Sequence, residues 1–358
     1  MAKYPRILID LDKIRQNAKS ITDLASKFDI EVTGVTKATC GDPLVAKAML
    51  DGGVVSIADS RMSNIRRMKD ADVDSEFLFL RTPMLSQAEE VVRFSDMSLN
   101  TEMDVVKELD KEAERLGTEH KIVIMLEMGE LREGINIEDS ISFIESAMEL
   151  ENIEIYGIGI NLACLSGVIP TKEKMADFGE LVKRLESRTG VTFKMVGGGN
   201  SANIPLLLKG ISTPGINNLR IGEAILLGLE TVNRCSIPGT YQDAFVLQAE
   251  IIEVNKKPSV PDGKISQNAF GETLEFEDKG IMRRGILALG RQDVIVESLR
   301  PLDNTITIES SSSDHIVVDL TNTRYKLGDK ISFLPGYGAL VHAFTSKFVK
   351  KEYLGGSS

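Results

Sequence analysis

The sequence predicts an α/β protein in which an N-terminal (β/α)8 barrel, a TIM barrel, is followed by a C-terminal, mainly-β domain. Two observations support this prediction. Up to about residue 235, short apolar runs of strand length alternate with amphipathic stretches. After about residue 240, β-branched residues alternate with polar ones between turns rich in Pro, Gly and Asp. With 358 residues, 42% of them hydrophobic, the chain is long enough to bury two cores.

The barrel is predicted by the number and spacing of its strand–helix units. Apolar residues at helical spacing over 12–28 precede a β-branched run at 31–36. Amphipathic stretches, 102–116 and 171–188 among them, separate the later runs. Those runs are 54–58, 76–80, 96–99, 121–126, 153–158, 192–196 and 216–221. Eight such units favour a barrel, and a doubly wound sheet is the alternative.

The predicted domain boundary is the Pro-Gly break within 233–240. We therefore assign 1–235 to the barrel and 236–354 to the β domain, with the first strand, 5–11, able to join either. Residues 355–358 (GGSS) are expected to be a tail outside the fold. In the second domain, His342 lies in the run ALVHAF and is expected to be a packed strand residue rather than a catalyst.

Charge and cysteine content narrow the class of protein. The chain carries 42 basic and 53 acidic residues, a net charge of −11, which argues against nucleic acid or an anionic membrane as a partner. Cys40, Cys164 and Cys235 are too widely spaced for a zinc site or a disulfide framework. Because neither a signal peptide nor an apolar run of about 20 residues is apparent, we expect a soluble, cytoplasmic protein.

Polar residues that directly follow predicted strands are candidates for chemistry, because barrel enzymes build their sites there. Lys37 follows the first barrel strand, where an amine among apolar neighbours would be nucleophilic, although strand-end lysines are usually solvated. The run 196–203 (VGGGNSAN) predicts either an anion site near Ser201 or a capped tight turn. Arg220 lies on the eighth strand, before Gly222; its simpler interpretation is an ion pair.

In this order and spacing, these features resemble the alanine-racemase type of pyridoxal 5′-phosphate (PLP) enzyme, called fold type III. The resemblance spans nearly the whole chain and includes the opening segment 5–11 with Asn17. The runs TKATCGDP, ADSRMSNIRR, GGGNSANIP and LGRQD are most similar to the ornithine-racemase branch. The resemblance implies an amino-acid racemase whose substrate is ornithine first and lysine second, with alanine as the alternative.

The resemblance also implies roles for individual residues. Lys37 would hold the cofactor covalently and act as a base on one face of the substrate Cα. Ser201, with Asn200 and the backbone amides around Gly222 and Glu223, would bind the cofactor, its phosphate in particular.

Arg220 would face the pyridine nitrogen of the cofactor. Because a guanidinium is effectively never deprotonated, it would keep that nitrogen from taking a proton. A less delocalised carbanion favours return of the proton to Cα over transamination, so Arg220 argues for racemisation.

Three positions depart from the family pattern. Arg132 matches the arginine that contacts the phenolic oxygen of the cofactor, but Met125 replaces the lysine that is carbamylated in many members. We therefore expect Glu127 or Glu130 to orient Arg132. Asn161 stands where the family has a histidine that stacks on the cofactor ring.

The second base is the third departure. In the family a tyrosine from the partner subunit's β domain serves the opposite face of Cα, which implies a homodimer. Here the segment 290–293 (GRQD) places Arg291 at that position, and arginine is a poor base at neutral pH. The candidates are Tyr337, Asp293, Asp314, His315 and Cys164. Ser313, Asp314 and His315 correspond to the segment that meets the substrate, and their polar, acidic character suits a cationic side chain.

Two rival functions fit the same resemblance. One is another PLP reaction, such as decarboxylation or D-amino-acid aldol cleavage, since a fold does not fix a reaction. Aldol cleavage would need metal ligands, and the spacing of His, Cys and Asp predicts no metal site. The other is a non-catalytic PLP-binding protein, although such homologues usually consist of the barrel alone.

Overall fold

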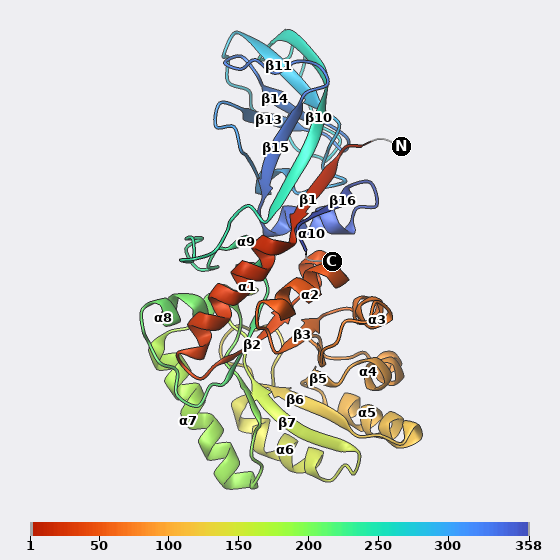
Figure 1. Cartoon of the computed structure of the whole chain (residues 1–358), viewed down its shortest axis with the longest axis vertical. Coiled ribbons are helices and arrows are strands. Elements are labelled where there is room, and N and C mark those ends of the chain that lie inside the picture. Colours follow the sequence, from red (N-terminus) through yellow and green to blue (C-terminus); the bar gives the residue numbers. More distant parts are fainter. Residues whose placement is uncertain (1–2, 357–358) are drawn as a thin grey trace. The chain divides into compact units, whose positions relative to one another are not determined.

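A computed structural model describes residues 3–356 as two compact units (Figure 1). The residues up to Asp10 belong with the segment from Asp243 onward, and Leu11–Gln242 form the other unit. The chain thus passes from one unit to the other between residues 10 and 11 and back again between residues 242 and 243. The sequence predicted a single boundary, between residues 235 and 236. Residues 357 and 358 of the expected tail lie outside the described residues.

The unit Leu11–Gln242 is a closed eight-stranded parallel barrel, which confirms the predicted fold and excludes the doubly wound sheet. Its strands follow one another around the barrel in sequence order. They are β2 (Glu31–Val35), β3 (Ser56–Asp59), β4 (Phe77–Phe79), β5 (Met97–Asn100), β6 (His120–Met125), β7 (Ile153–Gly159), β8 (Met195–Gly197) and β9 (Asn218–Ile221).

Helices precede, separate and follow these strands. They are α1 (Leu11–Ser26), α2 (Pro43–Asp51), α3 (Met62–Asp70), α4 (Ala88–Phe94), α5 (Met103–Leu116), α6 (Ser140–Met148), α7 (Lys172–Thr189), α8 (Ile204–Leu208) and α9 (Glu223–Leu227). In α5, Val105, Val106, Leu109 and Ala113 form one buried stripe at helical spacing. Gly117 ends α5 with a φ of 65°, a left-handed conformation that glycine adopts without strain.

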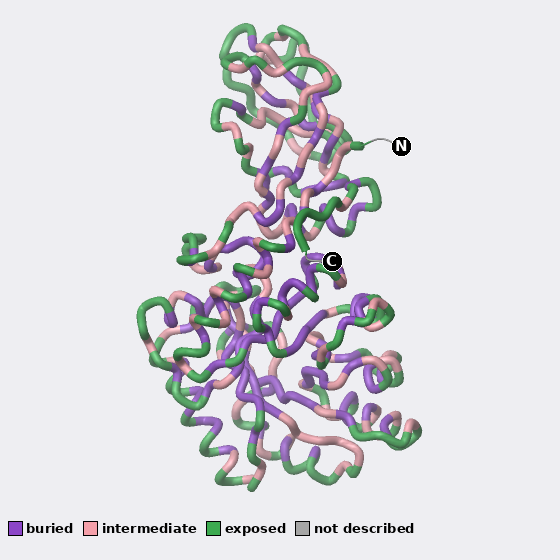
Figure 2. Tube along the Cα trace, viewed as in Figure 1, coloured by how far each residue is buried: buried purple, intermediate pink, exposed green. Residues whose placement is uncertain are grey.

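The barrel strands are almost entirely buried, whereas the outer faces of the helices and many of the loops are exposed (Figure 2). One buried apolar cluster draws its residues from β2 to β6 and from β8: Val35, Ala58, Leu78, Met97, Leu99, Val123, Met125 and Met195. Alternate residues of a strand point to opposite faces, so a strand covered on both faces is apolar along its length. This rigid barrel positions the loops that follow the strands.

The other unit is mainly β, as predicted, and its strands are mostly antiparallel. Its elements are β1 (Arg6–Asp10), β10 (Phe245–Pro258), β11 (Ile281–Leu287), β12 (Leu299–Pro301), β13 (Thr307–Ser311), β14 (Ile316–Asp319), β15 (Lys330–Pro335), α10 (Tyr337–Thr345) and β16 (Lys350–Leu354). The sheet order is β12-β15-β10-β11-β14-β13, and β1 pairs with β10 and with β16.

The expectation for His342 is wrong. The run ALVHAF belongs to helix α10, and His342 lies on its exposed side. Ala339, Leu340, Ala343 and Phe344 are the buried residues of this helix, and their spacing is that of one helical face.

No helix among residues 3–356 combines the length and the apolar character needed to cross a membrane.

Candidate active site

Lys37 follows β2 directly, and hydrogen bonds from its neighbours fix the turn that carries it. The hydroxyl of Thr36 donates to Oδ2 of Asp59 at 2.9 Å. Oδ1 of Asp59 accepts from the backbone N–H of Arg61 at 3.0 Å and from Nδ2 of Asn64 at 2.9 Å. Burial raises the pKa of Asp59, which is 0% exposed, although these hydrogen bonds act in the opposite direction. The Lys37 side chain itself is exposed.

The end of β9 lies against the end of β2, close to Lys37. A Cβ atom on Gly222 would be 3.1 Å from the carbonyl oxygen of Val35, so the close contact of these strands favours glycine. On the loop that follows β8, the hydroxyl of Ser201 accepts a hydrogen bond from the backbone N–H of Ala224 at 3.3 Å. Lys37, Ser201 and the start of α9 therefore lie at neighbouring strand ends, as the sequence analysis expected.

Asn161 and Asn200 are directly bonded to each other. Nδ2 of Asn200 donates to Oδ1 of Asn161 at 3.0 Å and to the carbonyl of Leu162 at 2.7 Å. Oδ1 of Asn200 caps the next turn by accepting from the N–H of Ala202 at 2.9 Å. In the described part of the chain, Nδ2 of Asn161 is buried without a hydrogen-bond partner.

Arg220 places a buried guanidinium at the centre of the site. It is 5% exposed, and Nη2 donates to the carbonyl of Ile160 at 2.7 Å. Nη1 is buried and has no hydrogen-bond partner among residues 3–356. Burial lowers the pKa of Arg220 to about 10, so the group stays protonated at neutral pH. Cβ atoms on Gly197 and Gly159 would be 2.5 and 3.4 Å from Nη1, so these glycines leave room for it.

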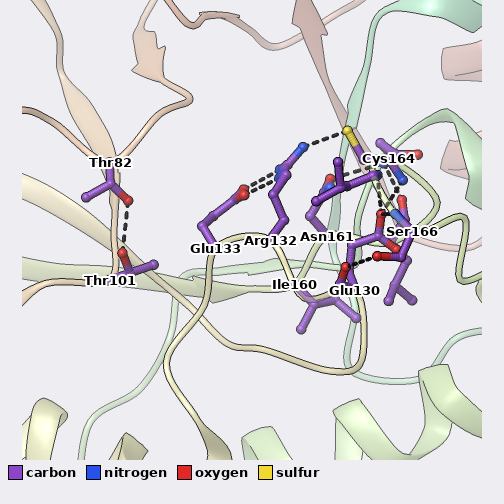
Figure 3. A network of polar contacts seen from close by, with 12 residues as sticks. Thr82, Thr101, Glu130, Arg132, Glu133, Ile160, Asn161, Cys164 and Ser166 are labelled. Atoms are coloured by element: carbon purple, nitrogen blue, oxygen red, sulfur yellow. Dashed lines mark hydrogen bonds and ion pairs between the residues drawn. The ribbon is translucent and has the colours of Figure 1, made fainter.

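Arg132 forms an ion pair with its sequence neighbour Glu133 (Figure 3). Its Nη1 also lies 2.6 Å from Sγ of Cys164, a free and exposed cysteine. The sequence predicted that Glu127 or Glu130 orients this arginine, but its direct ion pair is with Glu133, and Glu130 acts on it at longer range. The Glu127 carboxylate instead accepts from the backbone N–H of Gly129.

Glu130 has a different role from the one expected. It is 2% exposed, and its carboxylate accepts backbone N–H groups from the loop after β7. The donors are Ala163 at 3.0 Å, Cys164 at 2.6 Å, Ser166 at 3.0 Å, Val168 at 3.3 Å and Leu165. Burial acts to raise the pKa of Glu130, but these hydrogen bonds outweigh it and lower the pKa. A buried anion thus holds the loop that brings Cys164 to Arg132.

In the mainly-β unit, the segments containing Arg291 and Asp314 lie side by side. The backbone N–H of Arg291 donates to the carbonyl of Ser312 at 2.9 Å, and that of Gln292 donates to Ser313 at 3.0 Å. Nε2 of Gln292 also donates to Oδ1 of Asp314 at 2.8 Å. Ser313, Asp314 and His315 form an exposed turn between β13 and β14.

The other predicted residues of this unit differ in accessibility. Nη1 of Arg291 is 2.9 Å from both carboxylate oxygens of Glu272, and its guanidinium lies over the ring of Phe270. Asp293 is 4% exposed and accepts a hydrogen bond from the hydroxyl of Ser346 at 2.7 Å. Tyr337 is half-buried and begins α10.

Three features of the site were not predicted from the sequence. One is Glu133 as the partner of Arg132. Another is Asp59, which fixes the turn before Lys37. The third is an ion pair between Arg234 and Glu223, the first residue of α9. Within residues 3–356, no group of three or more His, Cys, Asp or Glu residues is arranged to hold a metal ion.

This geometry defines a (β/α)8-barrel protein with a lysine at its first strand and a buried arginine on its last. The family model described as alanine racemase, N-terminal domain, matches residues 9–229. The chain therefore belongs to the alanine racemase family, which depends on PLP.

Relatives and solved structures agree with this assignment. The chain is 42% identical to an ornithine racemase of Acetoanaerobium sticklandii, covering 98% of this chain and 100% of the relative. It is 40% identical to a lysine racemase of Thermotoga maritima, covering 98% of each. An alanine racemase structure from Streptomyces lavendulae matches with a TM-score of 0.76 at 16% identity, covering 99% of each chain. At that identity the structural match shows the fold alone.

Proposed function

We propose that this protein is a PLP-dependent racemase of basic amino acids, with ornithine as the first substrate and lysine as the second. The observation that carries the proposal is the buried Arg220 guanidinium, whose Nη1 has no hydrogen-bond partner in the described range 3–356. A buried N–H donor without a hydrogen bond costs free energy, so a site that retains one is suited to a ligand with an acceptor atom. The nitrogen of a pyridine ring is such an acceptor.

The residues present fit the cofactor at each of its ends. Lys37 would hold it covalently, Arg220 would donate to its ring nitrogen, and Ser201 with the amides around Gly222 would bind its phosphate. Arg132 would contact its phenolic oxygen. When bound, the cofactor would withdraw electrons from the bonds at the substrate Cα.

Racemisation requires proton exchange on both faces of Cα. The amine of Lys37 would take and return the proton on one face. For the other face, Tyr337, Asp314, His315 and Cys164 remain candidates. We assign Asp293 a structural role instead, because its buried carboxylate is hydrogen-bonded to Ser346.

The relatives support the choice of substrate. The two that cover 98% of the chain carry names of racemases for ornithine and lysine, at 42% and 40% identity. An alanine racemase of Methanococcus maripaludis is 27% identical over 82% of the chain. The higher sequence identity to the ornithine and lysine racemases than to this alanine racemase favours a substrate with a terminal ammonium group.

We also propose a cytoplasmic homodimer. Closed two-fold pairing is the commonest oligomeric arrangement, and the family resemblance implies that the partner's β domain completes the site. Cys164 and Cys235 are free cysteines, which suits a reducing compartment.

A pair of measurements tests the function. The PLP-loaded protein is incubated with L-ornithine in D2O while α-deuteration and optical rotation are followed together. Deuteration with loss of rotation is expected, and deuteration with retained rotation would exclude a racemase. Borohydride should fix PLP to the peptide containing Lys37, and Lys37→Ala should remove both the label and the activity. Labelling at Lys37 without substrate deuteration would indicate the non-catalytic alternative.

A further inference from the structure

An ion pair lies beside the proposed phosphate site. Glu223 is the first residue of α9, and its side chain is 14% exposed. It pairs with Arg234, whose side chain is 58% exposed. The N–H of Ala224, the residue after Glu223, bonds to the hydroxyl of Ser201. Ser201 is the residue expected to bind phosphate, so Glu223 is the sequence neighbour of a residue that contacts the proposed phosphate site.

The fold fixes the position of Arg234. Its loop bends around Glu230, a carboxylate that is 3% exposed. Backbone N–H groups of Val232, Asn233 and Cys235 donate to Glu230 at 2.7, 2.8 and 3.0 Å. Burial acts to raise the pKa of Glu230, but these hydrogen bonds lower it, so the anion persists at neutral pH. Arg234 itself has a φ of 59°, a left-handed conformation that is uncommon for residues other than glycine.

Glu223 presents an electrostatic conflict. Glu223 directly precedes Ala224, whose N–H bonds to Ser201 at the site proposed for a phosphate group, and two like charges in a partly buried site weaken binding. At a separation of about 5 Å, the loss of affinity would be about ten- to hundred-fold. A cation held against Glu223 removes this repulsion.

We propose that Arg234 is a positioning residue that neutralises Glu223 and so permits the cofactor phosphate to bind beside it. Arg234 acts through Glu223 and is not itself a phosphate ligand. The inference rests on the proposed function, because it assumes that the site binds PLP.

The test is a set of binding titrations on the full chain stripped of cofactor. PLP and pyridoxal, which lacks the phosphate, are titrated separately, and the absorbance of the lysine-bound form gives each Kd. Arg234→Gln should weaken PLP binding about ten- to hundred-fold while pyridoxal binding stays unchanged. Arg234→Lys, which keeps the charge, should restore most of the affinity. Glu223→Gln should bind PLP at least as tightly as the unchanged protein.

The double variant Glu223→Gln/Arg234→Gln separates neutralisation from direct contact. Neutralisation predicts affinity near that of the unchanged protein, whereas a double variant as weak as Arg234→Gln would make Arg234 a phosphate ligand and overturn the proposal. If Arg234→Gln lost equal affinity for PLP and pyridoxal, the ion pair between Arg234 and Glu223 would be a structural contact only. That result would also contradict the proposal. The matched control is Lys194→Gln, which should change neither Kd. It breaks the ion pair between Lys194 and Glu154, beside the amino-terminal ends of β8 and β7.

If the unchanged protein did not bind PLP at all, the proposed function would fail, and this inference with it. Normal PLP binding by Arg234→Gln would refute the inference alone.

Discussion

Nη1 of Arg220 lies where a side chain on Gly197 would begin. A Cβ atom at position 197 would be 2.5 Å from this nitrogen, closer than side-chain carbons normally approach. The two residues come from neighbouring strands, β9 and β8, and the glycine leaves room for the buried guanidinium. The position of Arg220 therefore depends on the absence of a side chain at residue 197.

Gly197→Ala should displace the Arg220 guanidinium without unfolding the barrel, because the atom it meets is the end of a flexible side chain. We expect kcat for racemisation to fall about ten-fold or more, corresponding to about 1.4 kcal/mol, with a small change in Tm. Gly159→Ala should have a smaller effect, since its Cβ would be 3.4 Å from the same nitrogen. Steady-state kinetics and thermal melts of both variants check this, and equal rates for Gly197→Ala and the unchanged protein would contradict it.

Arg220→Glu should change the course of the reaction as well as its rate. A carboxyl group facing the ring nitrogen can hold a proton there, which stabilises the carbanion and allows reprotonation away from Cα. Racemisation should slow and the fraction of transamination should rise, as measured by keto-acid formation per racemisation event. Arg220→Lys serves as the charge-conserving control. Unchanged partitioning in Arg220→Glu would mean that Arg220 does not face the ring.

Periodicity in the sequence predicted the barrel because each strand and helix is specified locally. The runs at 31–36 and 216–221 correspond to β2 and β9 within a few residues. The segment 5–11 could not be assigned from the sequence, since its apolar alternation does not reveal its partners. Those partners, β10 and β16, lie more than 200 residues away along the chain. The run ALVHAF was misassigned because a short apolar run fits a strand or a buried helix equally well.

Within the candidate site, the positions of Lys37, Ser201 and Arg220 could be predicted from the sequence, whereas the contacts that hold their neighbours could not. Lys37, Ser201 and Arg220 have distinctive positions after or on strands. The partners of Glu130 are backbone N–H groups some 33 to 38 residues further on, which no residue type reveals. Glu133 could have been found as the acid next to Arg132, but a neighbouring acid is too common to indicate a contact.

Glu130→Gln should loosen the loop 163–168. An amide has one oxygen in place of two and carries no charge, so at least two of the five backbone donors lose their acceptor and the others lose a charged one. Hydrogen bonds to a charged group contribute about 1.5–3 kcal/mol, so hydrogen exchange of these amides should accelerate about ten- to hundred-fold. Glu145→Gln, on the exposed side of α6, is the control and should leave exchange in the loop unchanged.

The same loop should be sensitive to acid. Because hydrogen bonds hold the pKa of Glu130 below its usual range, its contribution to stability is fully present above pH 4.5. It should be lost only as the pH falls through the lower pKa of the folded state. Loop protection that was already lost near pH 6 would contradict this assignment.

His120 should make the stability of the barrel depend on pH. It is 1% exposed, its Nε2 lies 2.9 Å from the hydroxyl of Ser98, and burial lowers its pKa to about 4. Between pH 6.5 and 4 the unfolded chain binds more protons than the folded one, so stability is full above pH 6.5 and falls toward pH 4. The shift corresponds to a loss of about 3 kcal/mol.

Urea unfolding at several pH values tests this contribution. His120→Gln should start from a lower stability but show a weaker loss between pH 6.5 and 4. The exposed His315→Gln should follow the pH profile of the unchanged protein. If His120→Gln and the unchanged protein had parallel profiles, another group would be responsible for the acid sensitivity.

Asp314 provides the test of substrate class. It lies in the exposed turn 313–315, and its Oδ1 accepts from Nε2 of Gln292 at 2.8 Å. A carboxylate that meets the terminal ammonium of ornithine or lysine contributes about 1–3 kcal/mol, about ten- to hundred-fold in kcat/KM. Alanine has no such group. Asp314→Asn should therefore reduce kcat/KM for L-ornithine and L-lysine much more than for L-alanine, whereas Gln292→Ala, which keeps the carboxylate, should reduce it little. Equal losses for the three substrates would place Asp314 in structure or general catalysis, and a preference of the unchanged protein for alanine would overturn the basic-substrate proposal.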